Sequence, residues 1–269
     1  CKMNLTELNV NPNEPTYADP GLLFKYSLIE GAGSYNTDVS VEQWGLMNWM
    51  MFTASRNGII PGEEYTIPTA KDAYWDEQYI NALLNVQEAL NLMNDSVQYT
   101  NMTAACKIWK VFLFQRLTDL WGDIPYSEAL QGYDELNYMP SYDAQSDIYQ
   151  DMLITLKNAS DQIDDSKDFF FEDIDLIYGG NVNAWIRFAN SLRLRLSIRI
   201  KNIEPGLYQS EMLDIENRTH IQSNDESALF PFNSENKNHF YGVWFTGQAA
   251  VQNNPSKFLV DKLLQLNDP

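Results

Sequence analysis

Apolar residues recur with a helical period along most of this chain. They line one face of a helix with about 3.6 residues per turn between residues 72 and 94, and again between residues 102 and 120. A polar connector, residues 94–103, separates the two runs and contains Thr100 and Asn101, residue types that cap helix starts. The pattern predicts two long antiparallel helices joined as a hairpin.

A second helical pair is predicted between residues 143 and 202. Apolar residues from 148 to 163 keep helical spacing, in a helix that is expected to open near Asp143. The later run NSLRLRLSIRI alternates apolar and polar residues, which taken alone indicates a strand. Read from Asn183, a suitable N-cap, the apolar residues keep a period of about 3.6, so we favour a helix.

The two hairpins, about residues 72–120 and 143–202, predict an all-α dominated fold of stacked helical hairpins, similar to tetratricopeptide repeats. Residues 223–247 are rich in aromatic and turn residues, which predicts irregular loops with one or two short strands. Further helices are expected at residues 19–30, 39–55 and 255–266. We therefore expect a helical scaffold with loop-rich segments and a few short strands.

The stretch LTDLWGDIPYSEAL ends the second predicted helix with unusually large residues. Gly122 suits a left-handed exit from the helix, Pro125 prevents its continuation, and Asp123 is expected to hydrogen-bond within its own turn. Trp121 and Tyr126 are then available to pack the turn against the adjoining hairpin. We interpret this stretch as an architectural clasp rather than a catalytic site.

Within the predicted helix after Asn183, Arg195 and Arg199 lie four residues apart and therefore share one face. A pair of arginines on one helix face could bind an anion. Ion pairs with carboxylates of neighbouring helices are the more common role, and we expect that role here.

The charge of the chain excludes some classes of partner. The 269 residues include 18 basic and 37 acidic ones, a net charge of −19 that repels phosphate backbones and anionic lipid head groups. We therefore expect no nucleic acid partner. Aromatic residues make up 13% of the chain, which indicates a folded protein, because disordered acidic chains are poor in aromatic residues.

The sequence lacks the motifs of nucleotide-binding loops, zinc sites and serine hydrolases. Its two histidines, His220 and His239, are far apart and have no metal-ligand spacing. An acidic run from Asp161 to Asp175 could hold a structural Ca²⁺ ion, although the EF-hand pattern is not met and a solvated loop is the simpler interpretation. We expect no other cofactor.

Two loop segments combine aromatic rings with amide and charged groups, the mixture that grips a sugar ring or a peptide without catalysis. The candidate ligand-binding residues are Arg56, Asn57, Tyr65, His239, Tyr241 and Trp244. The alternative is that these side chains pack the loops onto the helices.

The two cysteines have different expected roles. Cys106 lies in a helical run and is expected to be a small buried apolar residue. Cys1 precedes a polar segment rich in Asn and Pro, which is typical of a bacterial lipoprotein tether whose cysteine carries lipid. An arbitrary chain boundary is the alternative interpretation of Cys1.

Several of these elements together resemble the SusD/RagB family of Bacteroidetes outer-membrane lipoproteins. A helix runs into LWGDIPYSEAL, a second helix opens around Asp147, and a third carries WIRFANSLRLR from Trp185. Their order and spacing match the family over roughly residues 70–205, and Cys1 with its polar tether fits the same family. No ligand-binding motif of the family carries over to this sequence.

The resemblance implies a surface-exposed protein of the outer membrane, anchored by lipid on Cys1. It implies a SusC-like TonB-dependent transporter as partner and the capture of oligosaccharides or oligopeptides before import, with no bond broken. The chain then divides into a lipidated tether, residues 1–18, and a SusD-like helical domain, residues 19–269, whose C-terminal end is expected to be truncated.

Two other functions fit the residues. An all-α glycoside hydrolase would also use acidic and aromatic residues, and it needs two carboxylates that face each other across a cleft. A helical-repeat adaptor for protein partners needs an extended concave face and no small-ligand pocket. Between glycan and peptide ligands, the residues alone leave the choice open.

Overall fold

Helices dominate the architecture, as predicted for an all-α fold with a few short strands. The structure is a computed structural model, and it describes residues 18–33, 41, 45–55, 64, 71–94, 96–132, 136–168, 172–233, 238 and 253–268. None of the helices in these ranges is both long enough and apolar enough to span a bilayer.

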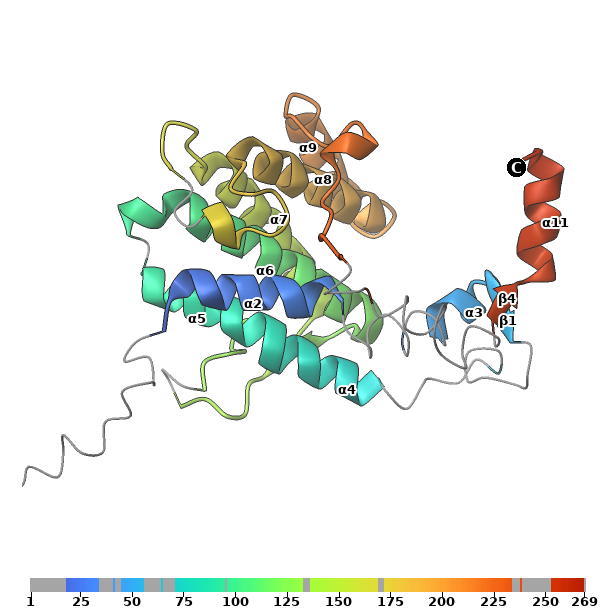
Figure 1. The fold of residues 1–269 in the computed structure, drawn as a ribbon, viewed down its shortest axis with the longest axis horizontal. Helices are drawn as coiled ribbons and strands as arrows, with labels where there is room; N and C mark the ends of the chain where they lie inside the picture. The colour runs from blue at the N-terminus through green and yellow to red at the C-terminus, as the bar shows by residue number, and fades with distance from the viewer. Residues whose placement is uncertain are drawn as a thin grey trace, which may run out of the picture.

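The first predicted hairpin is confirmed. Its first arm is a long helix in three consecutive parts: α4 (Lys71–Asp76), the π-helix η3 (Glu77–Leu83) and α5 (Leu84–Met93). The arm ends where Asn94 adopts a left-handed conformation with φ of 44°, and the 3-10 turn η4 (Val97–Tyr99) leads into the second arm, α6 (Thr100–Trp121). In Figure 1 the two arms lie side by side.

The second predicted hairpin is also confirmed, and it continues into one more helix. The helices α7 (Gln145–Gln162) and α8 (Val182–Ile200) pack against each other, with the 3-10 turn η5 (Glu172–Ile174) in their connection. The run NSLRLRLSIRI is therefore helical. A further helix, α9 (Pro205–Ile215), packs on α8 and was not predicted from the sequence.

The helix α6 lies at the centre of the helical body (Figure 1), where it packs against α5, α7 and α8. Buried residues occupy almost every position of its middle turns. This helix is therefore buried on nearly all sides rather than along one apolar stripe. Cys106 is among them and is fully buried, as predicted, and burial raises the pKa of its thiol.

The helix α2 (Pro20–Ala32) crosses α5 and η3 and approaches α6 closely at Gly31. A Cβ atom on Gly31 would lie 2.6 Å from Cδ2 of Leu113 and 2.8 Å from Cζ2 of Trp109. The Arg116 guanidinium donates to the Gly31 carbonyl oxygen at 3.0 Å. Glycine at this position therefore permits the close packing of α2 on α6.

Two small sheets accompany the helices. The antiparallel pair β2 (Ile124–Pro125) and β3 (Tyr142–Asp143) closes the loop between α6 and α7. The second pair, β1 (Thr53–Ser55) and β4 (Asn253–Pro255), lies beside the short helix α3 (Met47–Trp49) and before α11 (Lys257–Leu266).

The helix predicted over residues 39–55 is therefore wrong at its C-terminal end. Thr53–Ser55 pair with residues about two hundred positions away, a long-range contact that a local pattern does not reveal. The short 3-10 turn η6 (Asn224–Glu226) is the regular element within the described part of the predicted loop region. The helix predicted near 255–266 is confirmed, and the Ser256 side chain caps it by accepting from the Leu259 amide at 3.1 Å.

The architectural clasp predicted at residues 117–130 is confirmed in its packing. Gly122 ends α6 with φ of 75°, and the Trp121 ring stacks on Tyr74 at a centroid distance of 5.6 Å. The prediction for Asp123 is wrong, because its carboxylate does not bond within its own turn. It accepts from the Gln145 amide at 2.9 Å and so joins the clasp to the start of α7.

Three predicted helix caps are also wrong. Thr100 is the first residue of α6 rather than its cap, which is Tyr99. The cap of α8 is Asn181 rather than Asn183, and its side chain accepts from the Ala184 amide at 3.1 Å. Asn101 does not cap α6: its side chain holds the loop after α7, donating to the Asp164 and Lys167 carbonyls and accepting from the Asp164 amide. Residue type alone did not distinguish a local cap from a tertiary contact.

The ion pairs of α8 differ in part from expectation. Arg199 pairs with Asp119 of α6 at 3.1 Å, as predicted, whereas Arg195 forms no ion pair within the described ranges. The fully buried cation is Arg193, which pairs with Glu211 at 2.6 Å and Asp214 at 2.9 Å. These two acidic residues lie on α9, so the Arg193 cluster fixes α9 to α8.

Candidate functional site

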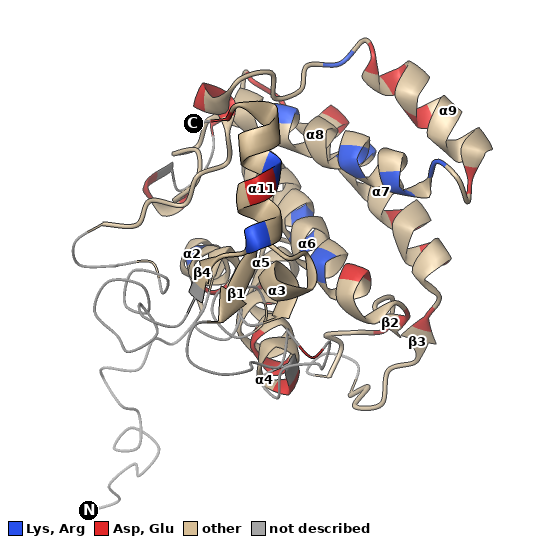
Figure 2. Cartoon of the chain, turned by 90° about the vertical axis from the view of Figure 1, so that its right-hand side faces the viewer, with Lys and Arg blue, Asp and Glu red and all other residues tan. Residues whose placement is uncertain are grey.

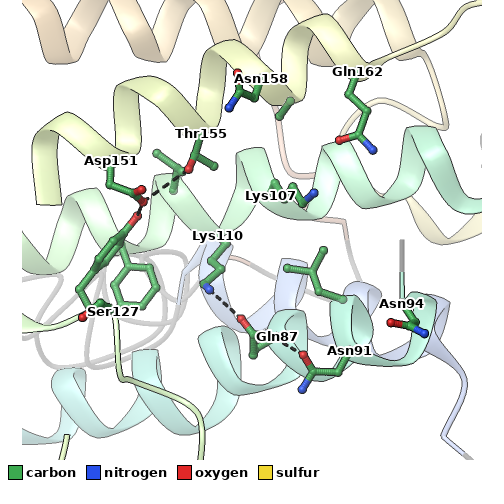
Figure 3. A pocket seen from close by; sticks show the side chains of 15 residues that line it. Gln87, Asn91, Asn94, Lys107, Lys110, Ser127, Asp151, Thr155, Asn158 and Gln162 are labelled. Carbon is green, nitrogen blue, oxygen red and sulfur yellow. Dashed lines mark hydrogen bonds between the residues drawn. The ribbon is translucent and has the colours of Figure 1, made fainter. Parts of the chain in front are cut away.

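A polar groove with a volume of about 630 Å³ lies between α5, α6 and α7, closed at one end by the residues that follow β2. Figure 3 shows side chains from these elements facing one another across it. Its lining residues are Gln87, Leu90, Asn91, Asn94, Lys107, Lys110, Val111, Phe114, Tyr126, Ser127, Asp151, Thr155, Asn158, Ala159 and Gln162.

The spacing of polar residues on the helices explains why they converge here. Gln87 and Asn91 on α5, and Asn94 directly after it, recur at intervals of four and three residues and so lie on one side. On α7, Asp151, Thr155, Asn158 and Gln162 do the same opposite them. Each helix buries its apolar face in the core and turns this polar face to the groove.

Lys110 of α6 lies between these two polar faces (Figure 3). Its ammonium group donates to Oε1 of Gln87 at 2.6 Å, and Nε2 of Gln87 donates to Oδ1 of Asn91 at 2.7 Å. The same ammonium lies 5.6 Å from the ring centroid of Phe114. Burial lowers the pKa of Lys110 to about 8, and the negative charge of Asp151 opposes only part of that shift.

The clasp forms one end of the groove. The Tyr126 hydroxyl donates to Oδ2 of Asp151 at 2.5 Å, and its ring meets Phe114 edge-on at a centroid distance of 4.7 Å. Asp143 of β3 holds this tyrosine in place by accepting from the Tyr126 amide at 3.0 Å. Burial and the bond to Asp151 raise the pKa of the Tyr126 hydroxyl, so it stays a donor. The structural clasp therefore also orients a wall of the groove.

Three amide side chains of the groove have unused hydrogen-bonding capacity. Asn94 on α5, together with Asn158 and Gln162 on α7, forms no side-chain hydrogen bond within the described part of the chain. Each amide offers two N–H donors and one carbonyl acceptor. The groove can therefore bind a ligand that is rich in hydroxyl or amide groups.

The same groove is poorly suited to hydrolysis. Among its described lining residues, Asp151 is the only carboxylate, and it is bound to the Tyr126 hydroxyl. Glycoside hydrolysis in its common forms needs a second carboxylate on the other side of the scissile bond. The arrangement supports binding rather than bond cleavage at this place.

A second hollow of about 530 Å³ lies where α6 and α8 meet the segment after η6. Its lining is largely aromatic and includes Trp109, Phe112, Phe188, Phe230 and Phe232, but Trp109 and Phe188 are buried. Arg195 also lines it, and burial together with the nearby Arg199 lowers the pKa of its guanidinium. The two buried rings offer little surface to a sugar, whereas Phe112, Phe230 and Phe232 are half-buried.

The ligand-binding residues predicted from the sequence, Arg56, Asn57, Tyr65, His239, Tyr241 and Trp244, all lie outside the described residues, as does Cys1. The structure brings together a different set, the residues of the polar groove. They were not predicted because the aromatic loop segments carry the stronger sequence signal for ligand binding. The available signal was the spacing of amides on the solvent faces of two helices.

The acidic run from Asp161 to Asp175 does not form a metal site in the described residues. No group of three or more His, Cys, Asp or Glu side chains there is arranged to hold an ion. Asp161 pairs with Arg218, and Asp175 is buried, accepting from the indole N–H of Trp185 at 2.7 Å. These carboxylates have separate structural partners.

Figure 2 shows basic residues along α6, whereas acidic residues predominate on α9 and at the visible end of α4. The described lining residues of the groove include two lysines, Lys107 and Lys110, and one carboxylate, Asp151.

A family model described as starch-binding and associating with the outer membrane, the SusD-like model, matches residues 12–269. Comparison with curated proteins gives no match. Among solved structures, a chitin-binding protein is 26% identical with a TM-score of 0.80, covering 93% of this chain and 53% of its own.

Two further solved structures are similar. A SusD-like protein described as Bacteroidetes AC2a is 25% identical, with a TM-score of 0.76 over 94% of this chain and 49% of its own. A chitin-binding SusD homologue from Flavobacterium johnsoniae is 23% identical, with a TM-score of 0.76 over 93% of this chain and 52% of its own. The present chain spans about half the length of these structures.

Proposed function

The chain belongs to the SusD-like family, described as starch-binding and associating with the outer membrane, and from this premise we propose that it captures oligosaccharides at that membrane. Members of the family are binding proteins rather than enzymes. We further propose that the captured glycan passes to a SusC-like TonB-dependent transporter. The family description of association with the outer membrane supports this step.

Glycans are proposed in preference to oligopeptides. The family description names starch, and two of the similar solved structures are described as chitin-binding. Starch and chitin share long runs of hydroxyl groups, and chitin adds acetamido groups. Both kinds of group match neutral amide side chains.

The observation that carries the proposal is the pair of amide-bearing helix faces across the polar groove. Asn158 and Gln162 of α7 face the groove from one side and Asn94 of α5 from the other (Figure 3). A ligand between them can be hydrogen-bonded from both sides without displacing an existing side-chain bond of these three residues.

The remaining parts of the proposal concern residues outside the described ranges. We propose that Cys1 carries the lipid anchor and that the protein is exposed at the cell surface. We also propose that Tyr65, Tyr241 and Trp244 offer rings to the sugar, and that Arg56, Asn57 and His239 bind its hydroxyl groups. Ring-on-sugar packing would add an apolar contribution to the hydrogen bonds of the groove.

The direct test is titration calorimetry of the chain with matched sets of maltooligosaccharides, chitooligosaccharides and mixed oligopeptides. We expect micromolar or weaker binding of at least one glycan set and no heat of binding from peptides. Binding of peptides alone would contradict glycan capture. Release of reducing ends from a bound oligosaccharide would contradict a purely binding role.

A further inference from the structure

Lys110 has an unusual environment for a lysine that is half-buried. It forms no ion pair within the described part of the chain, and its one side-chain hydrogen bond is to the uncharged Gln87. An ammonium group has three N–H donors, so two of them are unused by side chains. Burying a cation without an anionic partner costs free energy unless another group, such as a ligand, supplies the compensating negative charge.

The neighbouring carboxylate does not fill that role. Asp151 accepts the hydroxyl hydrogen of Tyr126 at 2.5 Å and a longer bond from Thr155 at 3.5 Å. It forms no ion pair with Lys110 among the described contacts. Lys107, one turn before Lys110 on α6, also lines the groove and has an interaction of its own. Among the described lining residues, Lys110 is therefore a cation with no ion-paired carboxylate.

From this placement we infer that the polar groove selects an acidic oligosaccharide, in which a sugar carboxylate or sulfate lies against Lys110. The inference rests on the proposed function and names the ligand class of the same groove. The hydroxyl groups of the same sugar chain would bind the amides of Asn94, Asn158 and Gln162. A neutral glycan would use these amides but leave the Lys110 ammonium without an anionic partner.

The net charge of −19 does not prevent this selection. At physiological ionic strength the Debye length is about 8 Å, so acidic side chains elsewhere on the surface are largely screened. An anionic group inside the groove would instead touch the Lys110 ammonium group, where screening is weak. Contact within the groove outweighs repulsion by the distant surface.

The selection must depend on pH. Lys110 faces Lys107 on its own helix, Asp151 on α7, Tyr126 after β2, and uncharged amides on α5. Its pKa of about 8 in the free protein means that it loses its charge as the pH rises through this value. A bound anion favours the charged form, so binding takes up a proton near pH 8 and weakens at higher pH.

The experiment compares two matched ligand pairs by calorimetry at pH 6.5 and pH 9.5. The first pair is oligogalacturonate and its methyl ester, which removes the carboxylate charge. The second is a sulfated and an unsulfated maltooligosaccharide. For at least one pair we expect the anionic member to bind at least tenfold more tightly than the neutral member at pH 6.5. This preference should be reduced severalfold at pH 9.5.

The variant is Lys110→Met, with Lys201→Met as the control. Lys201 is exposed at the end of α8, outside the groove, and its removal changes the net charge by the same amount. We expect Lys110→Met to lose most of the preference for the anionic ligand, and the control to keep it. An oligopeptide with a free C-terminal carboxylate serves as a third ligand and is expected to bind no better than the neutral sugars.

Three outcomes overturn the inference: equal affinity for both members of each pair, an anionic preference that survives Lys110→Met, or tighter binding of the peptide. In the first two, binding of the neutral sugars would leave the proposed glycan capture intact. If no oligosaccharide of either charge binds, the proposed function fails together with the inference. These results distinguish the two claims.

Discussion

The Tyr126 hydroxyl lies 2.5 Å from Oδ2 of Asp151 and joins the clasp after α6 to the solvent face of α7. The same bond occupies the single carboxylate among the described lining residues of the groove. Architecture and electrostatics thus meet at one contact: the bond that joins the clasp to α7 also engages the carboxylate whose charge acts on Lys110.

Removing that hydroxyl tests the coupling. In Tyr126→Phe, Asp151 is freed to pair with Lys110, so the pKa of Lys110 should rise and the preference for anionic sugars should fall. The lost hydrogen bond should lower the free energy of unfolding by about 1 kcal/mol. Urea denaturation and the paired-ligand titrations measure the two effects. Tyr138→Phe, at an exposed position, is the control and should change neither quantity.

The stability of the protein should depend on pH through Lys110. Its pKa is lowered from 10.5 to about 8 in the folded state. Between these two values the unfolded chain binds a proton that the folded chain has released, so the free energy of unfolding rises with pH in this window. Denaturation at pH 7 and pH 10 should show this increase in the wild type.

The variant Lys110→Met should lack that increase in stability between pH 7 and pH 10. At pH 7 it should be as stable as the wild type or more stable, by up to about 2 kcal/mol, because an apolar side chain avoids the desolvation of the cation. A marked loss of stability at pH 7 would contradict the view that Lys110 is kept for binding rather than for folding.

The Arg193 cluster should contribute strongly to stability. Arg193 is fully buried, and replacing it with Met removes the cation that pairs with both Glu211 and Asp214, although Asp214 keeps its ion pairs with Lys157 and Arg218. We expect a loss of about 3 kcal/mol in the free energy of unfolding. Arg195→Met, which removes an arginine without an ion pair in the described ranges, should cost much less.

Acid should weaken the same cluster. The pKa of Asp214 is lowered to about 2: its burial acts in the opposite direction and is outweighed by hydrogen bonds from Arg193, Arg218 and Lys157. Its contribution is therefore complete above the ordinary value of 3.8 and is lost as the pH falls toward 2. Acid denaturation curves of wild type and Asp214→Asn should converge at the low end of this range.

The close approach of α2 and α6 makes a further prediction. In Gly31→Ala the new methyl group would overlap Leu113 and Trp109, and we expect a loss of about 2 kcal/mol by thermal or urea denaturation. Gly206, at the start of α9, has open space around its missing Cβ. The matched variant Gly206→Ala should be neutral or slightly stabilising.

Much of the fold follows from apolar periodicity. The helices α5 to α8 were predictable because each buries apolar residues over several turns. In α8 the polar–apolar alternation alone indicates a strand, but the apolar spacing from the start of the segment indicates a helix. The helix α9 was missed because its one buried position, Ile215, gives no amphipathic stripe. Its position depends instead on the ion pairs with Arg193.

The groove was less predictable than the helices. Asn94, Asn158 and Gln162 look like ordinary solvent-facing residues in the sequence, and only the packing of α5 and α7 on either side of α6 brings them together. Asp123 and Asn101 were likewise expected to act locally and instead hold distant segments. A side chain that can bond its own turn can equally bond a neighbour, and the sequence does not distinguish these roles.

The central claim is that the amides of the polar groove bind an oligosaccharide. It is tested most directly by the affinity of the double variant Asn158→Ala/Gln162→Ala for the tightest-binding glycan, beside Gln150→Ala, an exposed amide of α7 outside the groove. We expect at least a tenfold loss of affinity in the double variant and no change in the control. Equal affinities in all three proteins would contradict the claim.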